Sequence, residues 1–359
     1  MVRIAIEHRL PTGSINSDVM AIRAGAAKLL FGSLVAVLMF AISDDRAAAQ
    51  GRHLDAATVI GPDACNECHE EVHAVWRQTR HATGFNRLTR HPITKTIAQA
   101  LRIDRIKKDS KCLGCHFLTR REGTSRYAAD GVVCEACHGA AKLWEPIHST
   151  FLGGARDAHS ETPAHRQQRY AAAEAAGWAP PRRLDRLARN CFQCHIVDDE
   201  ELVNRGRHPN GLQFELLAWT QGNMRHNVDY TTTNVEAPLN RRRVIFLTGQ
   251  ILAIKSILQA LGKAREEGPY SRNLTRRKAE TIATLRQITQ LVLVPEITRE
   301  ITTALTLIDA LGGRADPGLA TELDQLARKC ASDYDGAMLS GLDKLLPGRE
   351  DYRGEVFNP

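Results

Sequence analysis

The stretch CNECHEEVHAVWRQTRH, from Cys65 to His81, holds two cysteines and three histidines in seventeen residues. Its first five residues, Cys-x-x-Cys-His, recur as CLGCH at 112–116, CEACH at 134–138 and CFQCH at 191–195. Eight of the nine cysteines belong to these four motifs. Chance predicts on the order of 0.01 such pentapeptides in a chain of this composition, so four copies are a highly specific pattern.

The spacing of the motif suits covalent haem attachment. Two thiols three positions apart can add to both vinyl groups of one haem, and the histidine that follows then lies beneath the iron as its proximal ligand. We therefore predict four haem c groups. Their attachment sites are Cys65, Cys68, Cys112, Cys115, Cys134, Cys137, Cys191 and Cys194, and their proximal ligands are His69, His116, His138 and His195.

Other cysteine chemistries explain less of the pattern. A zinc ribbon uses paired Cys-x-x-Cys units but needs no histidine after every second cysteine. A thioredoxin-type pair occurs once, near a βαβ pattern that this sequence lacks. Structural disulfides fit an exported protein but leave the histidines unexplained.

The sixth iron ligands must be mostly histidines. Outside the motifs and the N-terminal leader nine histidines remain, and none lies beyond residue 226. Beyond the leader, the chain has only two methionines, Met224 and Met338, so four His/Met haems are impossible. Bis-histidine ligation favours lower reduction potentials than ligation by methionine.

The two extra histidines of the opening stretch have different expected roles. Residues 70–80 are predicted to be helical, which places His73 on the same face as His69. His73 cannot reach the opposite side of that haem, so we expect it at the surface or near a propionate, with a ligand role left open. His81 follows the predicted helix end and can reach another haem. Such a ligand would brace two cofactors against each other.

Three later histidines are also candidate distal ligands. His148 follows His138 by ten residues, and Pro146 between them predicts an extended approach. His208 and His226 lie in turn-like contexts beside Pro, Gly or Asn. The remaining histidines occupy polar, irregular segments and are expected at the surface; they are His53, His91, His159 and His165.

With these motifs in hand, the chain resembles the multihaem cytochrome family typified by cytochrome c-554. In the opening stretch Trp76, Thr79 and His81 match the family's Trp, small hydroxyl residue and His, although the hydroxyl residue is usually Ser. The third motif, GVVCEACHG at 131–139, matches closely and includes Glu135 and Gly139. The segment at 201–227 is similar to related multihaem cytochromes, through His208, Phe214, Trp219 and His226.

The resemblance covers roughly residues 60–230. It implies that His81, His148 and His226 are distal ligands to other haems, and that His208 is the fourth if every iron is six-coordinate. It also implies that one haem in such proteins can be five-coordinate. His148 lies further from its motif than the family pattern leads us to expect.

The N-terminus predicts export. Arg23 and Lys28 precede the fourteen-residue run LLFGSLVAVLMFAI, and three alanines follow at 47–49. The run is shorter than the roughly 20 residues that span a bilayer, so a cleaved signal peptide over 1–49 is favoured. Met20 is a possible true start. We expect a periplasmic or otherwise extracytoplasmic protein with no spanning segment in the mature chain.

The basic balance does not predict a nucleic-acid partner. The sequence pI is about 9.0, but residues 50–359 carry 43 Lys/Arg and 37 Asp/Glu, a net charge of +6. Both signs are spread along the chain, and export separates the protein from cytoplasmic nucleic acid.

The last third predicts a separate helical region. Helices are expected over 241–263, 276–294, 296–311 and 319–338, with Gly or Pro between them. Shorter helices are expected near 165–177 and 182–190. Cys330 lies on an apolar stripe and is interpreted as a packing residue. The bundle could contact a partner or a second copy of the chain.

The fold prediction is therefore mainly α: a multihaem cytochrome c domain with little regular sheet over 50–237, a helical bundle over 238–345 and a tail over 346–359. The predicted function is electron transfer between a redox donor and acceptor through mostly bis-His haems, with no catalytic residues of its own. The alternative is a haem enzyme that acts on a small nitrogen oxide or hydroxylamine at a five-coordinate iron.

Overall fold

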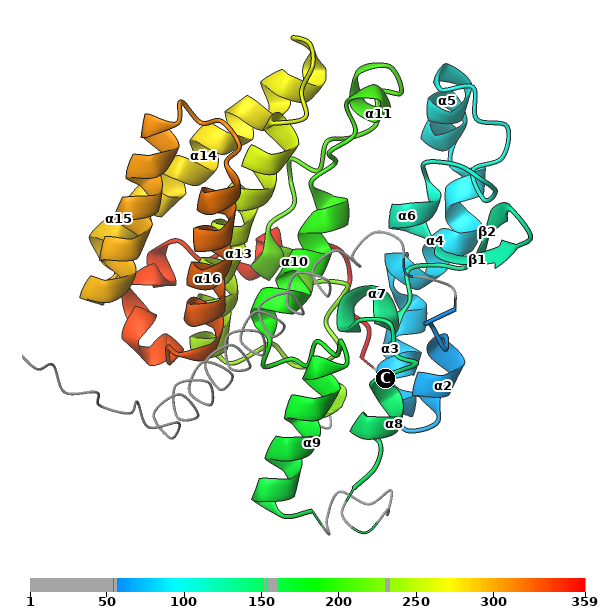
Figure 1. Cartoon of the computed structure of the whole chain (residues 1–359), viewed down its shortest axis with the longest axis horizontal. Coiled ribbons are helices and arrows are strands. Elements are labelled where there is room, and N and C mark those ends of the chain that lie inside the picture. Colours follow the sequence, from blue (N-terminus) through cyan, green and yellow to red (C-terminus); the bar gives the residue numbers. More distant parts are fainter. Residues whose placement is uncertain (1–53, 55–56, 152, 154–160, 230–232, 359) are drawn as a thin grey trace, which may run out of the picture. The chain divides into compact units, whose positions relative to one another are not determined.

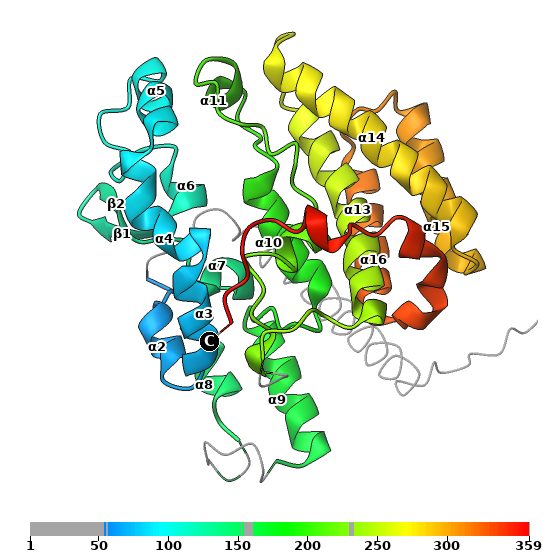
Figure 2. The same ribbon diagram turned by 180° about the vertical axis from the view of Figure 1, so that it is seen from behind.

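The computed structural model describes residues 54, 57–151, 153, 161–229 and 233–358, which belong to one compact unit (Figures 1 and 2). The predicted signal peptide, His53 and His159 lie outside the described residues. The mainly α prediction is confirmed, because helices dominate and the described residues contain a single two-stranded sheet.

The region around the first three motifs is built from short helices. They are α2 (Pro62–Asn66), α3 (Glu70–Gln78), α4 (Arg80–Arg87), η1 (Leu88–Arg90), α5 (Pro92–Ala100), α6 (Leu113–His116), α7 (Cys134–His138) and α8 (Glu145–His148). The helix expected over 70–80 ends earlier, because Thr79 has an extended backbone and its hydroxyl accepts a hydrogen bond from the Ala82 amide. Thr79 thus caps a new helix. His81 therefore lies in the first turn of α4, rather than beyond a helix end.

The sheet is a hairpin that joins the second and third motifs. Strand β1 (Leu118–Glu122) pairs antiparallel with β2 (Ser125–Asp130), and Gly123 in the turn has φ +58°. This small hairpin agrees with the prediction of little regular sheet.

The middle of the chain supplies α9 (Pro163–Ala175), α10 (Leu184–His195), α11 (Glu200–Asn204), α12 (Leu216–Thr220) and η4 (Asn227–Asp229). The helix expected near 182–190 continues through the fourth motif to His195. Its buried positions Leu184, Ala188 and Phe192 recur every four residues, so one face of α10 packs into the core.

The C-terminal helices are α13 (Leu239–Leu261), α14 (Pro269–Leu291), α15 (Pro295–Ala310), α16 (Pro317–Ser332), η5 (Gly336–Lys344) and η6 (Arg349–Asp351). The helix predicted over 319–338 ends at Ser332. Cys330 is fully buried, as expected for a packing residue.

Helix α13 is the central helix of this region. It is long and apolar enough to cross a membrane, with a mean hydropathy of 1.7, but 72% of that window is buried. It packs against α10, α14 and α16, so its apolar surface is covered by neighbouring helices.

The helix of the fourth motif and the bundle share one hydrophobic core, whereas the buried residues around the first three motifs form smaller separate clusters. It extends from Leu184 and Phe192 of α10 through α13 to Leu342 of η5. The predicted boundary at residues 237 and 238 falls within this continuous packing and remains a prediction from composition.

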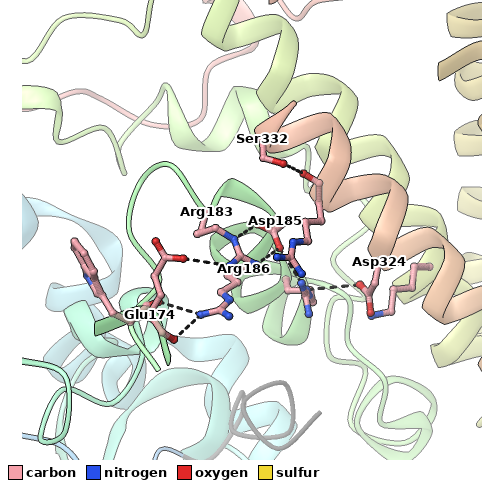
Figure 3. A network of polar contacts seen from close by, with 10 residues as sticks. Glu174, Arg183, Asp185, Arg186, Asp324 and Ser332 are labelled. Carbon is pink, nitrogen blue, oxygen red and sulfur yellow. Dashed lines mark hydrogen bonds and ion pairs between the residues drawn. The ribbon is translucent and has the colours of Figure 1, made fainter. Parts of the chain in front are cut away.

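A buried ionic network also connects helix α10 to the C-terminal bundle (Figure 3). The Asp185 carboxylate accepts hydrogen bonds from Arg183, at 2.9 Å, and from Arg189, at 3.0 Å. Burial alone would raise the pKa of Asp185, but hydrogen bonding to Arg183 and the surrounding arginine charges hold it below its usual value. Arg189 and Lys255 then meet Asp324 of α16, which links α10 to the bundle.

Candidate haem site

Each motif adopts a helical turn. Cys112 caps α6, the third motif is α7 itself, and the fourth ends α10. Residues three apart in a helix share a face, so each pair of thiols lies on one side of its turn. The proximal candidates His116, His138 and His195 are the last residues of their helices, and His69 is the N-cap of α3.

The structure brings each proximal candidate next to one of the predicted distal histidines. The distances between ring centroids are 6.2 Å for His69 and His148, and 6.1 Å for His81 and His195. They are 6.1 Å for His116 and His208, and 6.4 Å for His138 and His226. The eight histidines form four pairs, and no ring belongs to two of them.

These distances fit two imidazoles that bind one metal ion from opposite sides. A histidine nitrogen lies about 2 Å from a bound metal and about 1 Å from its ring centre, so two opposed rings should be separated by about 6 Å. Within the described residues no three His, Cys, Asp or Glu side chains cluster around a metal position. The candidate donor sets are facing imidazole pairs, which would fit a haem iron that takes two histidine ligands.

Backbone carbonyls orient several of these rings. His138 Nδ1 lies 2.9 Å from the Ala179 carbonyl, and His226 Nδ1 lies 2.7 Å from that of Met224. A similar contact of 2.8 Å joins His208 Nδ1 to Pro209. A carbonyl partner keeps the proton on Nδ1, so that Nε2 is the nitrogen with a lone pair that a metal can use, the usual arrangement of metal-bound histidine.

The His81–His195 pair lies in an apolar environment. Burial lowers the pKa of His81 to about 4 and that of His195 to about 3. Both rings are therefore neutral near pH 7, which is the form that binds a metal. Phe214 stacks on His195 at 4.3 Å and Trp219 meets the same ring at 4.9 Å.

His148 is held by an aromatic and ionic cluster. Its ring lies 4.5 Å from that of Trp178 and 5.8 Å from that of Trp144. The Arg169 guanidinium donates to the His148 carbonyl and forms two hydrogen bonds with the buried carboxylate of Glu161. Instead of the extended approach expected at Pro146, His148 ends the short helix α8, because proline is compatible with the first turn of a helix.

His208 lines a cavity of about 840 Å³ together with Phe214, Trp219 and Arg353. Its segment is clamped by the bundle. The buried Arg277 of α14 donates to the carbonyls of Gly211 and Phe214. The side-chain amide of Asn210 donates to the backbone carbonyl of Tyr270. The bundle thus fixes the loop that joins the fourth motif to α12.

Glu135 joins the first and third motifs. Its carboxylate is 1% exposed and accepts hydrogen bonds from the amides of Ile60, Gly61 and Ala141, at 2.7–3.0 Å. The Cys65 thiol also hydrogen-bonds to that of Cys134, which raises the pKa of Cys65 and lowers that of Cys134. The first and third motifs are therefore spatial neighbours.

The other histidines differ in their surroundings. His73 is buried and its ring packs 5.3 Å from Trp76, so the surface position expected for it was wrong. Helix α3 turns this face toward the interior, because Val75 and Trp76 are also buried. His91 is exposed as expected, and His165 is partly exposed beside Glu161.

Two positioning residues were missed at the sequence level. Arg277 follows Leu274 by three residues and precedes Thr281 by four, so it lies on the buried face of α14. Arginine at a core-facing position could have indicated a buried acceptor. Arg169 gave no comparable signal, because its partners, Glu161 and the His148 carbonyl, come from separate segments.

Comparison with known proteins supports the haem interpretation. Residues 64–139 match the family model described as cytochrome c554 and c-prime. The matched segment contains the first three motifs and Glu135, whereas the fourth motif and the bundle lie outside it. No curated protein and no solved structure gave a significant match. Over residues 64–139 the chain therefore resembles the cytochrome c554 and c-prime family, and this similarity supports a c-type cytochrome with covalently bound haem c.

Proposed function

We propose that the protein is an exported tetrahaem cytochrome that transfers electrons between redox partners. One observation carries the proposal: each motif histidine faces a second histidine at 6.1–6.4 Å. Haem iron cycles between ferric and ferrous states without bond making, so a stack of such groups can accept and pass single electrons.

The proposed ligand pairs cross-link distant parts of the chain. His81 on α4 would share an iron with His195 on α10, and His116 on α6 would share one with His208 beyond α11. Such pairs hold the cofactors at fixed separations and hold both axial positions during oxidation and reduction. Small reorganisation of the ligands favours electron transfer over substrate chemistry.

The polypeptide would favour low reduction potentials. No methionine is in a candidate ligand pair, and two imidazoles stabilise ferric iron better than a His/Met pair does. Burial of His81 and His195 beside Phe214 acts in the opposite direction, because an apolar environment disfavours the more charged ferric form. The haem at this pair is therefore proposed to have a higher potential than a solvent-exposed bis-His haem would have.

The enzymatic alternative requires an iron with an open face and a side chain that delivers protons. All four proximal candidates have an imidazole opposite them, so we favour the electron carrier. The leader sequence supports export, and we propose that residues 1–49 are removed before the holoprotein functions.

The proposal is tested on protein purified from cells competent in cytochrome maturation. Its mass should correspond to a chain that starts near residue 50 and carries four haem groups. Oxidised protein should give only low-spin signals in low-temperature electron paramagnetic resonance. The reduced protein should bind no carbon monoxide. Fewer than four haems, or a native high-spin iron that takes up the gas, would contradict the proposal.

A matched pair of variants tests the ligand assignment. His208→Ala should open one iron in four, producing a high-spin signal and uptake of one carbon monoxide per chain. His91→Ala, which removes an exposed histidine outside the pairs, should leave the spectra unchanged. Equal behaviour of the two variants would show that His208 is not an iron ligand.

A further inference from the structure

Positive charge is concentrated around the second motif. Residues 80–126 contain 12 Lys/Arg and three Asp/Glu, a net charge of +9. Residues 50–359 as a whole carry only +6, so the remainder of this span is slightly acidic at −3. Charge of one sign is therefore segregated into a segment of 47 residues.

The fold collects these residues on one group of elements. Helix η1 packs on α4 and α5, and α4 contacts α6 and β2. Lys108 forms a bridge to Tyr127 of β2, which brings the 101–111 loop to the hairpin. Both views place α5, α6 and the hairpin on the opposite side of α10 from α14 and α15 (Figures 1 and 2). We use the name basic face for the exposed Lys and Arg residues of these elements, which are Arg87, Arg90, Lys95, Arg102, Arg105, Lys108, Arg120 and Arg121. As neighbours in β1, Arg120 and Arg121 extend from opposite sides of the hairpin.

Within the described ranges, the residues of the basic face have no carboxylate within ion-pair distance. Among the described residues none of its eight members forms an ion pair with a carboxylate, whereas the nearby Lys111 pairs with Asp199 and Glu201. Arg121 lies directly opposite Arg126 in the hairpin, and like charges at such positions destabilise a sheet. Lys107 lies 3.3 Å from the centre of the Phe85 ring, and burial, with the charge of Arg90, lowers its pKa. Asp109 offsets part of this repulsion, because the backbone amide of Arg126 donates to its carboxylate and the charges of Lys108 and Arg126 help to lower its pKa.

The basic face adjoins the second haem motif. Lys111 immediately precedes Cys112, and β1 begins two residues after His116. Lys107 lies over Phe85, which packs edge-on against Phe117, and Phe117 contacts His116. The elements that carry the basic face therefore also carry the second motif, with its proximal candidate His116.

We propose that the basic face is the docking surface for an acidic redox protein, which exchanges single electrons with the haem bound by His116. This inference rests on the proposed electron-transfer function. In the reducing direction, one electron leaves the partner's reduced iron–sulfur or flavin centre, which is oxidised, and converts ferric haem iron to ferrous. No covalent bond changes in this step.

The composition of the face favours a protein over a membrane. Ile93, with 46% exposure, is the one large exposed hydrophobic among the described residues of 80–126. Ile97 on the same helix is buried, so α5 has no apolar stripe to insert into lipid. A small apolar contact within a charged rim suits a transient protein interface.

The test measures the rate at which a reduced plant-type [2Fe–2S] ferredoxin, an acidic protein of low potential, reduces the ferric holoprotein. Arg120→Glu/Arg121→Glu is compared with Arg272→Glu/Arg299→Glu, which makes the same charge change at exposed positions on α14 and α15. Electrostatic steering raises association rates by about 10-fold or more, so the first variant should react at least about 10-fold more slowly at low salt. The control should change by less than about two-fold, and the difference should vanish near 1 M salt, where screening is nearly complete.

Photoreduced 5-deazariboflavin, a small neutral donor, separates docking from electron uptake. All variants should accept four electrons from it; failure of the wild type here would refute the proposed function itself. If uptake is normal but the Arg120→Glu/Arg121→Glu and Arg272→Glu/Arg299→Glu variants react equally fast with the ferredoxin, the docking proposal is overturned. It is also overturned if the Arg120→Glu/Arg121→Glu variant loses only its binding to phosphatidylserine vesicles, because the basic face would then bind a membrane rather than a protein.

Discussion

Replacement of Arg277 tests whether the C-terminal bundle fixes the His208 segment. Arg277 is 7% exposed and donates to the carbonyls of Gly211 and Phe214. Arg277→Met keeps the length and apolar packing of the side chain but removes both hydrogen bonds. The two carbonyls would then be left without their present donor in a buried loop.

The expected loss follows from these two bonds. A hydrogen bond to a charged group contributes about 1.5–3 kcal/mol, so two contribute about 3–6 kcal/mol. Removal of a desolvated guanidinium, whose pKa burial has lowered, offsets part of this loss. We expect Arg277→Met to weaken the docking of residues 208–215 by about 2–4 kcal/mol, which corresponds to an increase of about 30- to 700-fold in amide exchange.

Hydrogen exchange of the holoprotein, resolved by peptide, is the assay. The matched control is Arg276→Met, whose side chain is 63% exposed and whose ion pair with Glu280 spans 3.9 Å. Such a surface change should stay within about 0.5 kcal/mol. Arg277→Lys should be intermediate, because it keeps the charge but not the two-pronged donor. Equal exchange in the Arg276 and Arg277 methionine variants would refute the reasoning.

Three further changes test individual contacts. Glu135→Ala should lower the free energy of unfolding by about 3 kcal/mol or more, because three backbone amides lose their acceptor. Glu135→Gln keeps one acceptor oxygen, so it should lower the free energy of unfolding by less, as measured by denaturant titration. Equal losses of stability in the two variants would contradict this account. Gly211→Ala should shift one low-spin resonance signal, because φ is +70° and a Cβ would lie 1.7 Å from the His195 carbonyl oxygen; an unchanged spectrum would show that the loop adapts. Hydrogen bonding to Arg169 lowers the pKa of Glu161 from 4.5 to about 2, so its stabilising contribution is present above pH 4.5 and is lost as the pH falls to 2. Glu161→Gln should therefore lower Tm at pH 6 and leave it nearly unchanged at pH 2, and a deficit independent of pH would argue against the ion pair.

The sequence indicated the cofactor and the helical class because both depend on local spacing. Two cysteines three apart and an adjacent histidine define a haem attachment motif wherever the chain lies. Helical periodicity likewise located α13 to α16, since each buries one face. Their ends were less predictable: Thr79 divides the first long helix by capping its successor, and residues 333–338 leave the helix expected there.

Only the tertiary structure decided which histidines face each other. The sequence supplied His81, His148, His208 and His226 as a set of candidates, but their partners lie 114, 79, 92 and 88 residues away, respectively. Such pairings depend on how separate helices pack, and no local pattern encodes them. The same holds for Arg277, whose acceptors come from a loop more than 60 residues earlier. Local chemistry thus indicated what the chain can bind, while packing between distant segments determined which candidate histidines face each other.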